Sequence, residues 1–335
     1  MSSGTYFCID AHTCGNPVRV VVGGAPPLRG STMIERRQDF LEHFDWVRTG
    51  LMFEPRGHDA MSGSILYPAT RDDCDIAVLF IEVSGCLPMC GHGLIGTVTV
   101  AVEHGLASGH EPGVLRLDTP AGVVVAGYTK ENGHVTDVTL KNVPSFVHSL
   151  GHTVTAPALG ELKLDIAYGG NFYAIVESQD GYDDVSQLSI ATIQNESRAI
   201  REQINNELDI RHPDQPSIAG VSHVQWTGTA LKDDSSARNC VFYGDKGIDR
   251  SPCGTGTSAR MAQLVARNEL KIGETFVHES IIGSQFRGRA VEKTRVGTFD
   301  AIIPEIQGWA RITGHNTLFL DSAYDPYSNG FQLPA

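Results

Sequence analysis

Two short stretches of the sequence each place a cysteine before a Gly-x-Gly turn that opens an apolar segment. They are "PMCGHGLIG" at 88–96 and "SPCGTGTSA" at 251–259. At a helix start, unpaired backbone N–H groups and the helix dipole favour an anion, and they lower the pKa of a thiol to roughly 3.5–7.5. Glycines beside the thiol also leave those N–H groups accessible to a ligand carboxylate. Cys90 and Cys253 are therefore the strongest candidates for chemistry in this chain.

Four kinds of chemistry use thiols of this type. A redox pair usually has its cysteines close together in sequence, as in C-x-x-C. A metal site built from Cys90, His92 and Cys253 matches no zinc spacing and has no evident fourth ligand. A cysteine hydrolase needs a single thiol with a histidine, which leaves the second motif unexplained. Proton transfer at one carbon from opposite faces uses both thiols, because one removes a proton while the other delivers one, and this inverts a stereocentre.

Short β-rich runs bounded by Gly, Pro, Asn or Asp dominate the elements that position these cysteines. Helices are predicted at 33–51, 92–107, 185–208 and 251–270 from apolar residues at helical spacing. Each half of the chain is thus predicted to wrap strands around one central helix that begins at a Cys-Gly. This is an internal duplication of architecture with little duplication of sequence. No linker separates the halves, and we place the boundary near "KNVPSF".

The composition limits the partners and the compartment. The 335 residues contain 26 basic and 39 acidic side chains, and the net charge of −13 argues against nucleic acid or an anionic membrane as a partner. No run reaches the ~18–20 apolar residues of a membrane span, and "MSSGTYFCIDAHTCG" lacks the basic start and apolar core of a signal peptide. A cytoplasmic location is expected. Seven irregularly spaced cysteines do not indicate a disulfide framework.

The two cysteine motifs, together with "IDAHTCGNPVRVV", "EPRGHDAMSGSILYP", "GGNFYAIV" and "GWARITGHNTLFLD", resemble the proline racemase family, whose fold is that of diaminopimelate epimerase. The resemblance implies an α/β (α+β) fold of two similar domains, each a strongly curved, mostly antiparallel sheet or barrel around a central helix. The expected domains are 1–142 with 308–335, carrying Cys90, and 143–307, carrying Cys253. A homodimer is compatible with this arrangement.

The family resemblance also implies a two-base reaction without a cofactor or metal, in a cleft between the domains. The sequence fits this, because it has no dinucleotide fingerprint and no lysine in a setting that suggests a pyridoxal Schiff base. By resemblance, the thiols of Cys90 and Cys253 are the acid–base pair acting on a small imino acid. The residues expected to hold the substrate carboxylate and nitrogen are Gly91, His92, Gly254 and Thr255, and Asp249 is expected to face the ring nitrogen. Asp249 also fits a structural role as a turn or cap residue.

Three positions bear on the substrate. Where proline racemases carry two ring-packing phenylalanines, this chain has Ser62 and Tyr243, and His223 falls where 4-hydroxyproline epimerases carry a substrate-contacting histidine. The resemblance therefore implies epimerisation of trans-4-hydroxy-L-proline to cis-4-hydroxy-D-proline, with proline racemase as the alternative. Retention of both thiols disfavours a trans-3-hydroxy-L-proline dehydratase, and a non-catalytic amino-acid-binding protein would not need them. Cys14, in the atypical "HTCGNP" loop, is expected to pack.

Overall fold

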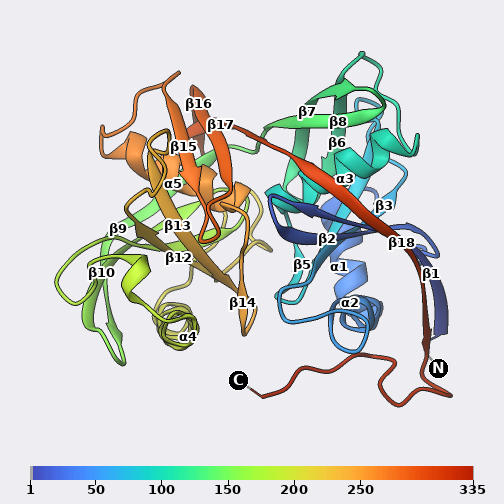
Figure 1. Cartoon of the computed structure of the whole chain (residues 1–335), viewed down its shortest axis with the longest axis horizontal. Helices are drawn as coiled ribbons and strands as arrows, with labels where there is room; N and C mark the ends of the chain where they lie inside the picture. Colours follow the sequence, from blue (N-terminus) through green and yellow to red (C-terminus); the bar gives the residue numbers. More distant parts are fainter. Residues whose placement is uncertain (1–2, 335) are drawn as a thin grey trace. The chain divides into compact units, whose positions relative to one another are not determined.

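The computed structural model describes residues 3–334, and the chain forms two compact units (Figure 1). Unit 1 comprises Met1–Leu140 and Gly308–Ala335, and unit 2 comprises Lys141–Gln307. The boundary expected from the sequence lies two residues after the observed one. The chain thus builds most of unit 1, forms unit 2 without interruption, and then returns to unit 1 with its last strand.

Unit 1 is a mixed sheet with three helices. Its elements are β1 (Ser3–Thr13), β2 (Asn16–Gly23), α1 (Met33–His43), α2 (Asp45–Met52), β3 (Ser62–Tyr67), β4 (Ile76–Glu82), β5 (Gly85–Leu87), α3 (Gly91–Glu103), β6 (Val114–Thr119), β7 (Gly122–Glu131), β8 (His134–Lys141) and β18 (Ala310–Asp321). Strand β1 lies antiparallel between β18 and β2, and β2 runs parallel to β3. Strand β4 is antiparallel to β3 and β5 and parallel to β6.

Unit 2 repeats this pairing pattern. Its elements are β9 (Ser145–Ala156), β10 (Gly160–Tyr168), β11 (Phe172–Val176), the short 3-10 helix η1 (Val185–Gln187), α4 (Ile190–Glu207), β12 (Val221–Gly228), β13 (Ala237–Tyr243), β14 (Gly247–Ile248), α5 (Gly254–Ala266), β15 (Thr275–Glu279), β16 (Gln285–Val296) and β17 (Phe299–Gly308). Strand β11 runs parallel to β12, and β13 is antiparallel to β12 and β14 and parallel to β15. The predicted duplication of architecture is confirmed.

Each unit surrounds one buried helix, as predicted. Helix α3 contacts β1, β2, β3 and β18, and helix α5 contacts β9, β10, β11 and β16. Helix α3 forms despite its β-branched residues because it is buried among these strands. The buried hydroxyls of Thr97 and Thr99 donate to carbonyls one turn back, so neither is left without a partner. Gly96 permits close approach to β2, since a Cβ there would lie 3.0 Å from Val18 side-chain atoms.

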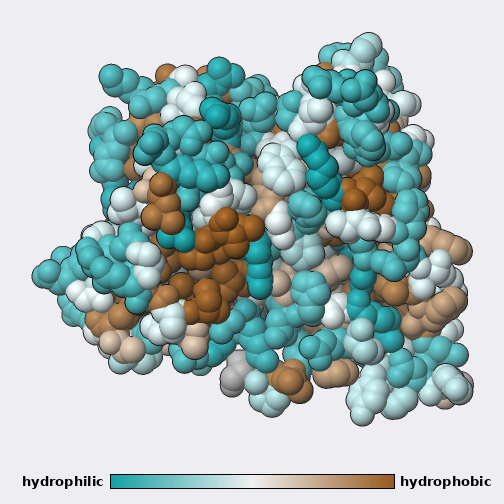
Figure 2. Space-filling model, in the orientation of Figure 1, coloured by the Kyte–Doolittle hydropathy of each residue, from teal (hydrophilic) through white to brown (hydrophobic). Residues whose placement is uncertain are grey.

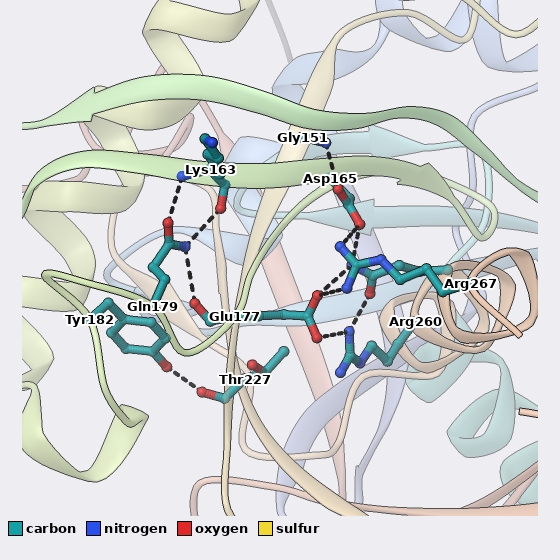
Figure 3. A network of polar contacts seen from close by, with 10 residues as sticks. Gly151, Lys163, Asp165, Glu177, Gln179, Tyr182, Thr227, Arg260 and Arg267 are labelled. Atoms are coloured by element: carbon teal, nitrogen blue, oxygen red, sulfur yellow. Dashed lines mark hydrogen bonds and ion pairs between the residues drawn. The ribbon is translucent and has the colours of Figure 1, made fainter. Parts of the chain in front are cut away.

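A polar network fixes the C-terminal half of α5 (Figure 3). Arg260 Nη1 lies 2.7 Å from Glu177 Oε1, and Arg267 pairs with both Glu177 and Asp165. The Gln263 amide donates to Asp165 Oδ2 at 2.6 Å. The two carboxylates come from β10 and the residue after β11, so the network ties the helix to these strands. It thereby sets the position of the opposite, N-terminal end of α5, where Cys253 lies.

Two helix predictions need correction. The segment 33–51 is not one helix, because the chain breaks at Phe44, which ends α1 and serves as the N-cap of α2. The first turn of α2 is stabilised by its own ion pair, in which the Asp45 carboxylate accepts two hydrogen bonds from Arg48 at 2.6 Å. The segment 185–208 also divides, since η1 precedes α4 and the Ser189 side chain caps α4 by accepting from Thr192 N at 3.0 Å.

The polarity of the surface and the state of the cysteines match what the composition predicts. The face seen in Figure 2 is mostly hydrophilic, with hydrophobic side chains gathered in a few patches. Among the described residues, no helix has both the length and the apolar character needed to cross a bilayer. All seven cysteines lie within these residues as buried thiols without a disulfide, which confirms the prediction that the chain has no disulfide framework.

Candidate active site

Cys90 is the N-cap residue of α3 and is buried, with 3% of its surface exposed. Its thiol donates a hydrogen bond to Oε1 of Glu82 across 3.1 Å. Glu82 is the last residue of β4, and its other oxygen accepts from the Ser84 hydroxyl at 2.8 Å. The short hairpin between β4 and β5 therefore holds a carboxylate directly against the thiol. Glu82 is not predictable from the sequence motifs, because this residue closes an apolar strand and has no motif of its own.

His92 lies beside the same thiol. Its Nδ1 and Nε2 are 3.6 and 3.9 Å from Cys90 Sγ. Nε2 also lies 2.8 Å from the Ser62 hydroxyl and 2.9 Å from the Asn16 side-chain nitrogen. The structure thus brings together three of the predicted residues, Ser62, Cys90 and His92, and assigns the hydroxyl of Ser62 a contact that orients the imidazole.

The hairpin between β1 and β2 supports His92 from the other side. The Thr13 hydroxyl donates to the backbone oxygen of His92 at 2.7 Å. Cys14 and Gly15 form the two-residue turn with φ of 48° and 96°, the combination that a type I′ hairpin requires. Cys14 is 1% exposed, and its thiol lies 3.6 Å from the backbone oxygen of Trp309. Cys14 is therefore buried against the chain that leads into β18, and a packing role for it stays a prediction.

Cys253 occupies the corresponding place in unit 2, as the N-cap of α5, and is 4% exposed. Its Sγ lies 3.2 Å from the Tyr173 hydroxyl and 4.0 Å from that of Thr255. Tyr173 and Thr255 also hydrogen-bond to each other at 2.5 Å. The backbone of Cys253 has φ 62° and ψ 108°, a strained conformation for a non-glycine residue, and such strain concentrates at functional sites.

The environment of Cys253 changes one expectation from the sequence. Burial raises the pKa of its thiol well above the ordinary value, and the nearby Asp249 raises this pKa further. The Tyr173 hydroxyl, the Gly256 N–H and the Thr255 hydroxyl lower the pKa, but less than burial raises it. The low pKa expected from the helix start is therefore wrong for Cys253, because removal from water disfavours the thiolate more than the first helical turn stabilises it.

Asp249 shapes the turn that leads into α5. Its Oδ1 accepts from both the backbone N–H and the hydroxyl of Ser251, each at 2.8 Å. The Ser251 hydroxyl in turn accepts from Cys253 N at 3.2 Å. The structural role considered for Asp249 is therefore present, since the buried carboxylate sets the approach of the chain to the cysteine. A contact with a substrate nitrogen remains a prediction.

His223 and Tyr243 gather on the same side of unit 2 as Tyr173. The ring of His223 lies 4.7 Å from that of Tyr173 and 6.2 Å from that of Tyr243, with interplanar angles of 30° and 23°. Nδ1 of His223 lies 2.7 Å from the Ser222 hydroxyl. Both predicted positions are thus linked through Tyr173 to the Cys253 thiol. Tyr173 itself was missed, although it stands in the "GGNFYAIV" motif.

A glycine three residues after each cysteine packs against the sulfur. A Cβ on Gly93 would lie 2.9 Å from Cys90 Sγ, and a Cβ on Gly256 would lie 3.1 Å from Cys253 Sγ. Gly91 and Gly254, which the sequence singled out, are instead the first residues of their helices. The repeated C-G-x-G spacing indicates the glycine that packs on the sulfur, because the third residue of a helix lies over the N-cap residue.

Comparison with known proteins identifies the family to which this fold and these two helix starts belong. Residues 8–332 match the family model described as proline racemase, and the chain belongs to this family. The 4-hydroxyproline 2-epimerase of Ancylobacter novellus is 59% identical over 331 residues, which cover 99% of each chain. A hydroxyproline epimerase from Agrobacterium vitis, solved with bound trans-4-hydroxy-L-proline, superposes with a TM-score of 0.90 at 34% identity over 98% of this chain and 95% of that one. A PhzF-family protein from Bacillus anthracis shares the fold alone, with a TM-score of 0.59 and 16% identity over 95% and 99% of the two chains.

Proposed function

We propose that the protein is a 4-hydroxyproline 2-epimerase that interconverts trans-4-hydroxy-L-proline and cis-4-hydroxy-D-proline without a cofactor. The observation that carries this proposal is the duplication at the helix starts. In each unit a buried thiol precedes the central helix, with a glycine three residues later packed on its sulfur. A relative with 59% identity over nearly its whole length, named 4-hydroxyproline 2-epimerase, supports the assignment.

In the proposed reaction, one of Cys90 and Cys253 acts as a thiolate and removes the proton from C2. The other acts as a thiol and delivers a proton to the opposite face of the same carbon. One proton leaves and one arrives, so the product is an isomer and nothing is oxidised or reduced. The reverse reaction exchanges the two roles. Backbone N–H groups at the helix starts, from Gly91 and Gly254 onward, would stabilise the charge that develops on the substrate carboxylate.

Two contacts support a preference for a hydroxylated ring. Nδ1 of His223 is held by Ser222 at 2.7 Å, so Nε2 is the nitrogen proposed to meet the ring hydroxyl. The neighbouring Tyr243 ring, 6.2 Å from that of His223, would line the same face of the substrate. A site built to hydrogen-bond a substrate hydroxyl discriminates strongly against the analogue that lacks it, because its own polar group is then left unpaired.

Chiral chromatography tests the proposal on trans-4-hydroxy-L-proline, L-proline and trans-3-hydroxy-L-proline side by side, with enzyme dialysed against a chelator. We expect the highest kcat/KM on trans-4-hydroxy-L-proline, with cis-4-hydroxy-D-proline as the product. An equal or higher value on L-proline would identify a proline racemase. A pyrroline released from the 3-hydroxy compound would identify a dehydratase, and binding without turnover would identify a binding protein.

A further inference from the structure

Three different metal-ligating groups converge around Cys90. A carboxylate oxygen of Glu82, the thiol sulfur of Cys90 and a ring nitrogen of His92 lie within 4.8 Å of one another, and all three residues are buried. The sulfur is 3.1 Å from Oε1 of Glu82 and 3.6 Å from Nδ1 of His92. In a tetrahedral zinc site, bond lengths of about 2.3 Å to sulfur and 2.0 Å to nitrogen or oxygen separate such donors by about 3.5 Å. The donors therefore already stand near the spacing of zinc ligands.

We propose that Glu82, Cys90 and His92 form an inhibitory site for Zn²⁺ and related divalent cations. This inference rests on the proposed function, because it assigns regulation to the thiol on which that reaction depends. Zinc accepts thiolate, imidazole and carboxylate ligands together, and three protein ligands leave one tetrahedral position for water. On binding, the Cys90 thiol loses its proton to solvent and forms a metal–sulfur bond. Coordination to the cation lowers the basicity of the sulfur, so it no longer removes a proton from substrate.

The surrounding contacts orient two of the three donors as a metal site requires. The Ser62 hydroxyl and the Asn16 side-chain nitrogen lie 2.8 and 2.9 Å from Nε2 of His92, and these contacts hold the imidazole with Nδ1 toward the sulfur. The Ser84 hydroxyl binds Oε2 of Glu82 and turns Oε1 toward the thiol. Outer partners of this kind fix the ligand orientation in metal sites, and their loss typically weakens metal affinity roughly 10- to 100-fold.

Within residues 3–334, the other thiol belongs to no such group of three metal ligands. The neighbours of the Cys253 sulfur are the hydroxyls of Tyr173 and Thr255, which are poor zinc ligands beside imidazole and carboxylate. The two units therefore share a fold, but their two thiols differ in the metal ligands beside them. We expect the cation to bind at the Cys90 helix start and not at the Cys253 helix start, which gives a matched pair of variants for a test.

The test is a titration of chelator-treated protein with Co²⁺, followed by the thiolate-to-cobalt charge-transfer band in the near ultraviolet. His104 and His315 form a separate exposed pair with ring nitrogens 3.0 Å apart, so every protein carries His104→Ala to remove it. The band should form in this background and in Cys253→Ser, and should be absent from Cys90→Ser. A band that survives Cys90→Ser, or that disappears with Cys253→Ser, would overturn the assignment.

Two further measurements connect binding to turnover. Ser62→Ala should weaken Co²⁺ affinity roughly 10- to 100-fold, as expected for loss of an outer partner, while its circular dichroism stays unchanged. Zn²⁺ should inhibit epimerisation in competition with substrate, and a chelator should restore the rate fully. Activity lost on chelation of the untreated enzyme would refute an inhibitory site.

The readouts separate this inference from the function on which it rests. The cobalt band needs no turnover, so a protein that binds cobalt through Cys90 but epimerises nothing would refute the proposed function alone. A protein that epimerises hydroxyproline without a band dependent on Cys90 would refute the metal site alone.

Discussion

The thiol of Cys90 donates to the carboxylate of Glu82 across 3.1 Å. At the equivalent position in unit 2 the Cys253 sulfur instead meets the phenol of Tyr173 at 3.2 Å. The two helix starts therefore share an N-cap thiol with a glycine packed on its sulfur, but they differ in the group that can exchange a proton with that sulfur. If each thiol serves one face of the substrate, the two directions of the reaction should respond differently to pH and to substitution.

Replacement of either thiol should abolish epimerisation. Cys90→Ser and Cys253→Ser keep nearly the same side-chain volume and retain a residue suited to a helix N-cap, so both should fold. A serine hydroxyl is too weakly acidic to serve as the returning base. Chiral chromatography should show no epimer from either variant, whereas solvent deuterium exchange at C2 can continue from one stereoisomer. Near-normal epimerisation by Cys253→Ser would contradict the two-thiol mechanism.

Tyr173→Phe should slow the direction in which Cys253 acts as the base. The Tyr173 hydroxyl lowers the pKa of the Cys253 thiol, so its removal raises that pKa and decreases the thiolate fraction at a given pH. We expect kcat/KM in that direction to fall on the order of ten-fold, with the acid limb of the pH profile moved to higher pH. Tyr67→Phe, which loses a bond to the backbone of Pro26, should leave the profile in place.

Alanine at Gly93 or Gly256 should reduce turnover while the fold persists. The new methyl group would lie 2.9 Å from the Cys90 sulfur in one variant and 3.1 Å from the Cys253 sulfur in the other. The sulfur must move away, and displacements near 1 Å in a catalytic group cost up to about 100-fold in rate. Gly127→Ala is the matched control, because the nearest atom to its Cβ is 3.9 Å away. Unchanged kcat/KM in both site variants would show that the sulfur positions are not critical.

His223→Leu should change the substrate preference more than the overall rate. Loss of the proposed contact with the ring hydroxyl should lower kcat/KM on trans-4-hydroxy-L-proline roughly 10- to 100-fold, and should affect L-proline less. The ratio of the two kcat/KM values is the measurement. An equal decrease on both substrates would mean that His223 supports the Tyr173 ring without contacting the hydroxyl.

The buried His278 should make the protein less stable in acid. Burial, aided by the charge of Arg260, lowers the pKa of His278 to about 3, whereas an unfolded histidine titrates near ~6.5. Between these values the unfolded chain binds a proton that the folded chain does not, so stability falls as pH falls, by up to about 1.4 kcal/mol per pH unit. In His278→Gln the slope of unfolding free energy against pH, measured by urea denaturation, should decrease by about one proton. An unchanged slope would contradict the assignment.

Local sequence was sufficient for the helix starts, because Cys90 and Cys253 are each fixed by the glycines beside them. The partners of the sulfurs were harder to predict, since Glu82 and Tyr173 come from strands and reach the thiols only through the pairing of the sheet. The raised pKa of Cys253 was also beyond a local pattern, because it follows from burial by the whole of unit 2. The family resemblance supplied the site residues that spacing alone does not identify.

The pairing of β1 with β18 has a consequence for biosynthesis. Residues 3–13 align with 310–321 along the full length of both strands, so β1 leaves the ribosome about 300 residues before the strand that covers one of its edges. All of unit 2 is translated in that interval and can fold first, which reverses the usual N-to-C order of domain folding during synthesis. Nascent chains arrested before Gly308 should therefore expose the β1 edge and recruit chaperones that recognise unpaired strands.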